Sequence, residues 1–125
     1  MELEVGAMSE QPTVYTDGTT LSPQEVLMVA KQQAKVAVSE DAWPSIHAAR
    51  AVVDRIVTTG ETVYGINTGF GALVHERISN EDLAALQLNL IRSHATAIGD
   101  NMSVEAVRAM MLVRLNSLCK GHSGI

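Results

Sequence analysis

Apolar residues recur at helical spacing along most of this chain, and they predict about four helices. The first helix is expected to begin at Ser22, which forms a capping box with Glu25, and to run to about Lys35. The second helix begins near Ser39, and Gly60 supplies its stop. The pattern therefore favours a mainly α fold.

Two further helices follow in the second half of the chain. Ser79 is the expected cap of the third, in which the helical spacing places His94 in the middle of a buried apolar stripe. Ser103 starts the fourth, which is apolar on nearly every side as far as Cys119. A helix of this kind must be enclosed, but the preceding helices and the hairpin are expected to cover only about two sides of it. Its arginines, Arg108 and Arg114, need carbonyl or carboxylate partners.

The segment before the first helix predicts β structure. Residues 13–16 and 19–21 read as a short hairpin, because the intervening Asp17-Gly18 supplies the backbone conformations of a tight turn. Residues 36–38 are β-prone and are expected to add a short strand beside it. Residues 1–12 are polar without periodicity and are expected to be disordered, so the folded part spans residues 13–125.

A glycine-rich loop separates the second and third helices. Gly65, Gly69 and Gly71 follow Tyr64 and are expected to shape this loop, because glycine permits positive φ and close backbone approach. Their spacing matches neither the dinucleotide fingerprint nor the phosphate-binding P-loop. From the residues alone, an ordinary connection with a half-buried tyrosine is favoured over a catalytic loop. Likewise, a core histidine bonded to a carbonyl is favoured for His94.

Composition narrows the function classes. A chain of 125 residues is long enough for one hydrophobic core, and its net charge of -5 argues against nucleic-acid or anionic-membrane partners. A single cysteine excludes an internal disulfide, and the acidic start and the absence of a long apolar run predict a cytoplasmic protein. His47 and His75 have no ligand-spaced partners and are expected at the surface, so we expect no metal site.

Three segments together resemble the histidine ammonia-lyase and aromatic amino-acid lyase family, including its aminomutase branch. They are Tyr64-Gly-Ile-Asn-Thr-Gly-Phe-Gly71, residues 86–95 (LQLNLIRSHA) and residues 114–124 (RLNSLCKGHSG). They occur in the family's order, and the resemblance covers the chain from about Thr19 onward. The resemblance implies the N-terminal part of the ammonia-lyase fold, incomplete at its C-terminal end.

The resemblance also implies a chemistry and its residues. Tyr64 matches the family's catalytic base, which removes a β-proton as ammonia leaves an aromatic L-amino acid. His94 matches the position that contacts the substrate ring, and Asn67 and Leu73 are expected beside the substrate. L-Histidine, converted to urocanate, is the preferred substrate. A tyrosine ammonia-lyase or a tyrosine 2,3-aminomutase is the alternative, and a non-catalytic helical subunit that binds a partner chain is the third interpretation.

The family's prosthetic group is 4-methylidene-imidazol-5-one, called MIO, which forms from an Ala-Ser-Gly tripeptide. This sequence has no Ala-Ser-Gly, since Ser123-Gly124 follows His122. We therefore expect the chain to be inactive without a downstream half or a second polypeptide. Because the family forms tetramers, the resemblance also implies that this protein forms a homo-oligomer.

Overall fold

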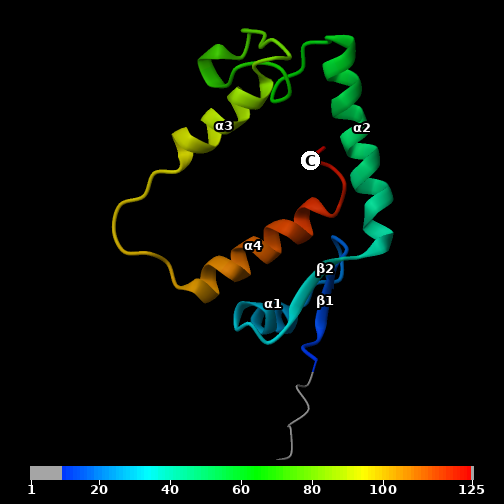
Figure 1. Ribbon diagram of the computed structural model, residues 1–125, viewed down its shortest axis with the longest axis vertical. Coiled ribbons are helices and arrows are strands. Elements are labelled where there is room, and N and C mark those ends of the chain that lie inside the picture. The colour runs from blue at the N-terminus through cyan, green and yellow to red at the C-terminus, as the bar shows by residue number, and fades with distance from the viewer. Residues whose placement is uncertain (1–9, 125) are drawn as a thin grey trace, which may run out of the picture. The chain divides into compact units, whose positions relative to one another are not determined.

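The computed structural model describes residues 10–124, whose contacts divide them into two compact units. The first unit contains residues 10–45 and 102–120, and the second contains residues 46–101 and 121–124. Figure 1 shows the elements, which are mainly helical with one short pair of strands. The mainly α fold and its four α-helices are confirmed for the described residues. The disorder expected for residues 1–12 falls largely outside them.

The strands of the first unit run parallel. β1 (Thr13–Thr16) pairs with β2 (Lys35–Val38), with Thr13 opposite Lys35 and Thr16 opposite Val38. The expected strand near residues 36–38 is confirmed as β2, but the expected hairpin is wrong. A hairpin joins antiparallel strands, whereas a parallel pair needs a crossover, and here α1 (Pro23–Ala30) lies between the two strands.

The Asp17-Gly18 turn leads into this crossover instead of closing a hairpin. The Asp17 carboxylate accepts the backbone N–H of Thr19 at 2.7 Å and that of Thr20 at 2.8 Å. These donors hold the pKa of Asp17 well below its usual range, because they stabilise the charged form. Gly18 has φ +92°, and its N–H donates to Asn116 Oδ1 at 2.9 Å. The turn is thereby fixed to a residue far along the chain.

Helix α1 begins as predicted and ends earlier than predicted. The capping box is confirmed, with Ser22 Oγ accepting the N–H of Glu25 and the Glu25 carboxylate accepting the N–H of Ser22. The helix stops at Ala30, and Gln32 has φ +60°, a left-handed conformation that ends a helix. The chain needs the remaining residues to turn and enter β2.

Helix α4 (Val104–Leu118) packs against α1 and completes the core of the first unit. Its start at Ser103 is confirmed, since Ser103 Oγ accepts the N–H of Ala106. Arg108 Nε donates to the Val29 carbonyl at 3.1 Å, which is the kind of partner expected for an arginine in this helix. The core of the first unit consists of Val14, Val29, Ala34 and Leu112.

Part of the apolar surface of α4 stays uncovered in this chain. Met110, Met111 and Val113 are 56%, 66% and 51% exposed. Within the described residues the rest of the chain therefore covers this helix only in part, as expected. Cys119, which follows the helix, is buried at 2% exposure.

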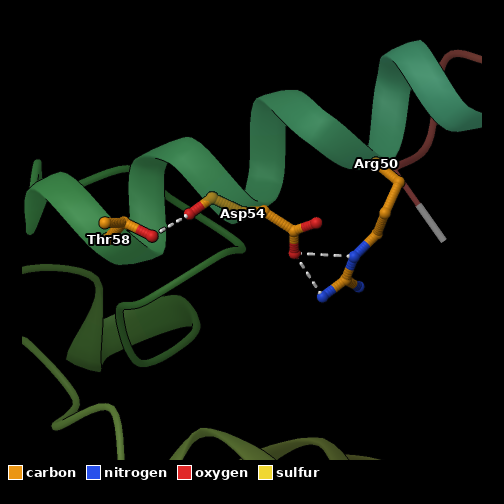
Figure 2. Close-up of polar contacts among 3 residues, drawn as sticks. All are labelled: Arg50, Asp54 and Thr58. Carbon is orange, nitrogen blue, oxygen red and sulfur yellow. Dashed lines mark hydrogen bonds and ion pairs between the residues drawn. The ribbon is translucent and has the colours of Figure 1, made fainter.

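Helix α2 (Trp43–Thr59) contributes residues 46–59 to the second unit. Ile56 of this helix is buried, and Gly60 ends the helix at φ +72°, as predicted. Figure 2 shows the solvent side, where Arg50 and Asp54 form an ion pair at 2.7 Å and Thr58 Oγ donates to the Asp54 carbonyl at 2.8 Å. None of the helices within residues 10–124 is long and apolar enough to cross a membrane.

Helix α3 (Leu83–His94) begins four residues after the predicted cap. Ser79 instead heads the preceding turn, in which its Oγ donates to an Asp82 carboxylate oxygen at 2.7 Å. The glycine-rich loop and a short 3₁₀ helix, Gly71–Leu73, lie between α2 and α3. The second unit therefore consists of two helices joined by an extended loop, which carries the predicted site residues.

Candidate active site

Tyr64 lies in a tight turn of the glycine-rich loop. The N–H groups of Ile66 and Asn67 both donate to the Val63 carbonyl, at 3.1 and 3.3 Å. Gly65 has φ +80°, a conformation that residues with a side chain rarely adopt. The turn projects Tyr64 outward, and its side chain is 61% exposed.

Gly69 has a different role from Gly65 and Gly71. Gly71 also has a positive φ, at +57°, but a Cβ there would meet no neighbour. A Cβ at Gly69 would lie 2.6 Å from the Leu73 Cβ and carbonyl oxygen. The loop thus requires two glycines for their backbone angles and one for close approach to the 3₁₀ helix.

Asn67 lies beneath the turn and is fully buried, at 0% exposure. Its side-chain oxygen accepts the Val63 N–H at 2.9 Å, and its side-chain nitrogen donates to the Glu61 carbonyl at 2.7 Å. The amide is therefore engaged by the main chain in this structure. Its expected contact with substrate stays a prediction.

A pocket of about 390 Å³ lies between the glycine-rich loop and α3. It brings together Gly69, Leu73 and His94, three residues that the sequence analysis singled out. The full lining is Gly69, Phe70, Leu73, Glu76, Ile78, Leu86, Asn89, Leu90, Ser93 and His94. The wall is largely apolar with a few polar groups, which is the usual composition of a small-molecule site.

Tyr64 is outside this lining but lies next to it through Phe70. The two rings meet edge to face, with centroids 6.0 Å apart and planes at 69°. Phe70 therefore contacts Tyr64 and also forms part of the pocket wall. One aromatic side chain separates the predicted base from the pocket that holds His94.

The orientation of the His94 ring follows from its hydrogen bonds. Nδ1 lies 2.8 Å from the Leu90 carbonyl oxygen, which can only accept, so Nδ1 carries the proton. Ser93 Oγ lies 3.0 Å from the same nitrogen and 2.8 Å from the same carbonyl. In the neutral ring Nε2 is then a hydrogen-bond acceptor.

The burial expected for His94 is wrong for the described chain. His94 is the last residue of α3, and its side chain is exposed. Within the apolar stripe of α3, Leu86 and Leu90 are only partly buried, and Ile91 is 66% exposed. The stripe therefore ends at the edge of the pocket and does not surround the histidine.

Sequence reasoning missed Phe70, Glu76, Asn89 and Ser93 as pocket residues. Asn89 and Ser93 are four residues apart, so their position on one face of a helix could have been recognised. Phe70 lay within the loop motif. Glu76 follows an irregular segment, and no periodicity could have placed it in the wall.

The remaining histidines do not join this site. His47 and His75 have exposed side chains, as expected. Across residues 10–124, no three histidine, cysteine, aspartate or glutamate residues lie close enough together to hold a metal ion.

Comparison with known proteins defines the class and then the family. The structural neighbours of this helical chain include ammonia-lyases and aminomutases. Residues 21–125 match the family model described as aromatic amino acid lyase, and the chain belongs to this family.

Three similar proteins illustrate the match. Histidine ammonia-lyase from Staphylococcus aureus is 47% identical over 112 residues, which are 90% of this chain and 22% of that protein. The crystal structure of histidine ammonia-lyase from Trypanosoma cruzi is 45% identical with a TM-score of 0.82, over 90% of this chain and 22% of that one. Tyrosine aminomutase from Streptomyces globisporus is 32% identical with a TM-score of 0.83, over 91% and 22%. The chain spans about a fifth of the length of these relatives.

The MIO group does not fit the residues present. It is built from Ala-Ser-Gly, and the 125 residues contain Ser123-Gly124 after His122 but no such tripeptide. The 125 residues therefore offer a tyrosine and a pocket, and not the tripeptide from which that electrophile forms.

Proposed function

We propose that this chain is the N-terminal part of a histidine-ammonia-lyase-like enzyme, with L-histidine as the preferred substrate. The observation that carries the proposal is the pocket shared by His94, Leu73 and Gly69, whose wall residue Phe70 contacts Tyr64. The similarity to histidine ammonia-lyases over 90% of the chain supports the choice of reaction.

In the proposed elimination, Tyr64 is the base. Its phenolate oxygen takes a proton from Cβ of the substrate, and the electrons of that C–H bond form the double bond between Cα and Cβ. The bond between Cα and nitrogen breaks, and the amine leaves with that electron pair. A group outside these residues must activate the amine as a leaving group. A substrate can reach the Tyr64 side chain, because this side chain is exposed on a tight turn.

His94 is the proposed contact for the substrate ring. Its Nδ1 is occupied by the Leu90 carbonyl, so Nε2 is available as an acceptor for a ring N–H. An imidazole substrate supplies such a donor, whereas a phenyl ring does not. A site built to bond a polar group discriminates strongly against an analogue that lacks it. Leu73 offers an apolar surface to the same ring.

A tyrosine ammonia-lyase or a tyrosine 2,3-aminomutase is the second candidate. A phenol O–H could donate to His94 Nε2 just as an imidazole N–H could. The similarity to tyrosine aminomutase from Streptomyces globisporus favours keeping this alternative. The substrate profile of the assembled enzyme separates the two.

The proposed enzyme requires further polypeptide. The chain spans about a fifth of its relatives, and the exposed apolar side chains of α4 offer a surface for a downstream segment or another copy of the chain. A tetramer and a cytoplasmic location stay predictions. If α4 only binds a partner and no chemistry follows, the chain is the non-catalytic helical subunit of the third interpretation.

The test is complementation with a polypeptide that carries the remaining part of the lyase. We expect urocanate to form from L-histidine faster than coumarate forms from L-tyrosine, and no product from this chain alone. Tyr64→Phe should lower kcat by about 10²-fold or more, because it removes the proton acceptor.

Tyr15→Phe is the matched control, since Tyr15 is 60% exposed and Tyr64 is 61% exposed. This control should keep full activity. Equal activity of the two variants would exclude Tyr64 as the base, and failure of every combination to form product would favour the non-catalytic interpretation.

A further inference from the structure

We propose that Asn67 is a positioning residue, whose side-chain amide holds the turn that presents Tyr64 and ties this turn to the pocket wall. Its catalytic consequence rests on the function proposed above, whereas its effect on the loop does not. The proposal starts from burial, because Asn67 is one of only three described residues whose large side chains are less than 2% exposed.

The Asn67 amide closes the turn from below. Its Oδ1 accepts the Val63 N–H at 2.9 Å, and its Nδ2 donates to the Glu61 carbonyl at 2.7 Å. Both bonds reach the chain just before Tyr64, while the Asn67 N–H donates back to the Val63 carbonyl at 3.3 Å. Tyr64 thus lies inside a ring of hydrogen bonds that begins and ends at one residue.

The main chain around Asn67 connects this ring to the pocket. The Asn67 carbonyl accepts the Ile78 N–H at 2.9 Å, and the Gly69 N–H donates to the Glu76 carbonyl at 2.9 Å. Ile78, Glu76 and Gly69 all line the pocket that contains His94. The position of Tyr64 is therefore coupled to the wall of the pocket that contains His94 through a short path of hydrogen bonds.

Only a side-chain amide of this length meets both needs. The site requires one donor and one acceptor on the same short side chain, and an asparagine supplies both. Aspartate keeps the acceptor but places a second oxygen against the Glu61 carbonyl, and alanine removes both groups. A buried partner left without its hydrogen bond is costly, so we expect alanine to loosen the turn at both Val63 and Glu61, and aspartate to loosen it only at Glu61.

Hydrogen exchange of the Val63 amide in the 125-residue chain measures the hydrogen bond from Val63 to Asn67 directly, without an activity assay. Asn67→Ala should speed Val63 exchange by about tenfold or more, because the acceptor is lost. Asn67→Asp should keep Val63 slow, since its oxygen remains. Asn116→Ala is the matched control, because it removes another asparagine bond to a backbone N–H, that of Gly18.

The complemented enzyme then tests the catalytic consequence. Asn67→Ala should lower kcat by about 10²-fold with KM nearly unchanged, because a displaced base slows proton removal more than it weakens binding. Asn67→Asp should recover part of that loss, and Asn116→Ala should leave kcat unchanged. A general loss of folding would instead lower the fraction of active enzyme in both Asn67→Ala and Asn67→Asp.

The outcomes separate this inference from the proposed function. Unchanged Val63 exchange in Asn67→Ala would overturn the inference whatever the enzyme does. Faster exchange with full kcat, in an enzyme that Tyr64→Phe inactivates, would overturn the positioning role. If Tyr64→Phe stays active, the proposed function fails and the exchange result alone decides the structural part. If Asn67→Ala unfolds the second unit, Asn67→Asp provides the test. We expect slow exchange of the Val63 amide and an intermediate kcat in that variant, and the absence of both would overturn the inference.

Discussion

The two units of this chain differ in the balance of apolar and polar side chains that they bury. The first unit has an apolar core of Val14, Val29, Ala34 and Leu112, and it also buries one polar side chain fully, that of Thr16. In the second unit the most deeply buried side chains are the polar Asn67 and Thr68, and α3 has no buried residue among those described. Apolar burial is non-directional and gives stability, whereas hydrogen bonds have fixed geometry and give position. The unit that carries the candidate site is organised by the second kind of interaction.

The largest expected effect on this comparison comes from the apolar core. Leu112 is 3% exposed, and Leu112→Ala should lower the free energy of unfolding of the first unit by about 2–5 kcal/mol. Met111→Ala, at a neighbouring position that is 66% exposed, should change it by less than about 0.5 kcal/mol. Urea unfolding followed through the amide signals of the first unit measures both, and equal losses would disprove a localised core.

An intermediate effect is expected at the start of α1. Ser22→Ala removes a capping bond and should destabilise the first unit by about 1 kcal/mol. Ser39→Ala is the control, since Ser39 precedes a short 3₁₀ helix and its side chain makes no capping bond. The same urea titration applies, and a Ser39 variant as unstable as the Ser22 variant would show that capping is not the cause.

The smallest effect is a pH dependence confined to the first unit. Backbone donors at Thr19 and Ser22 lower the pKa values of Asp17 and Glu25, so the unfolded chain binds protons more readily than the folded one. The resulting stability is present at neutral pH and is lost as the pH falls below about 4, where the unfolded carboxylates become protonated.

Asp17→Asn should remove most of that acid dependence. Asn67 and Thr68 do not titrate, so the Val63 amide of the second unit should keep its protection factor over the same range. Unfolding midpoints of the first unit at pH 7 and pH 3 provide the measurement. Equal acid sensitivity of the variant and the unsubstituted chain would contradict the assignment to Asp17.

Distant contacts decided several features that the sequence did not disclose. The partner strand of β1 lies about twenty positions away in the sequence. The Asp-Gly turn signal therefore predicted a hairpin, whereas the folded chain forms a parallel pair through a crossover. The pocket combines residues 69–78 with α3, and Glu76 could not have been placed there from any periodic pattern. The exposure of His94 follows from the end of α3, which depends on the segments around it.

Three local signals were read correctly from the sequence by itself, although the Ser79 cap and the end of α1 were not. The Ser22 capping box, the Gly60 stop and the Ser103 cap involve residues within a few positions of one another, so their hydrogen bonds need no tertiary partner. Motif order also pointed to the family, and the family model confirms it. Only the tertiary structure decided the strand pairing, the burial of Asn67 and the pocket beside Phe70, because each requires segments brought together by folding.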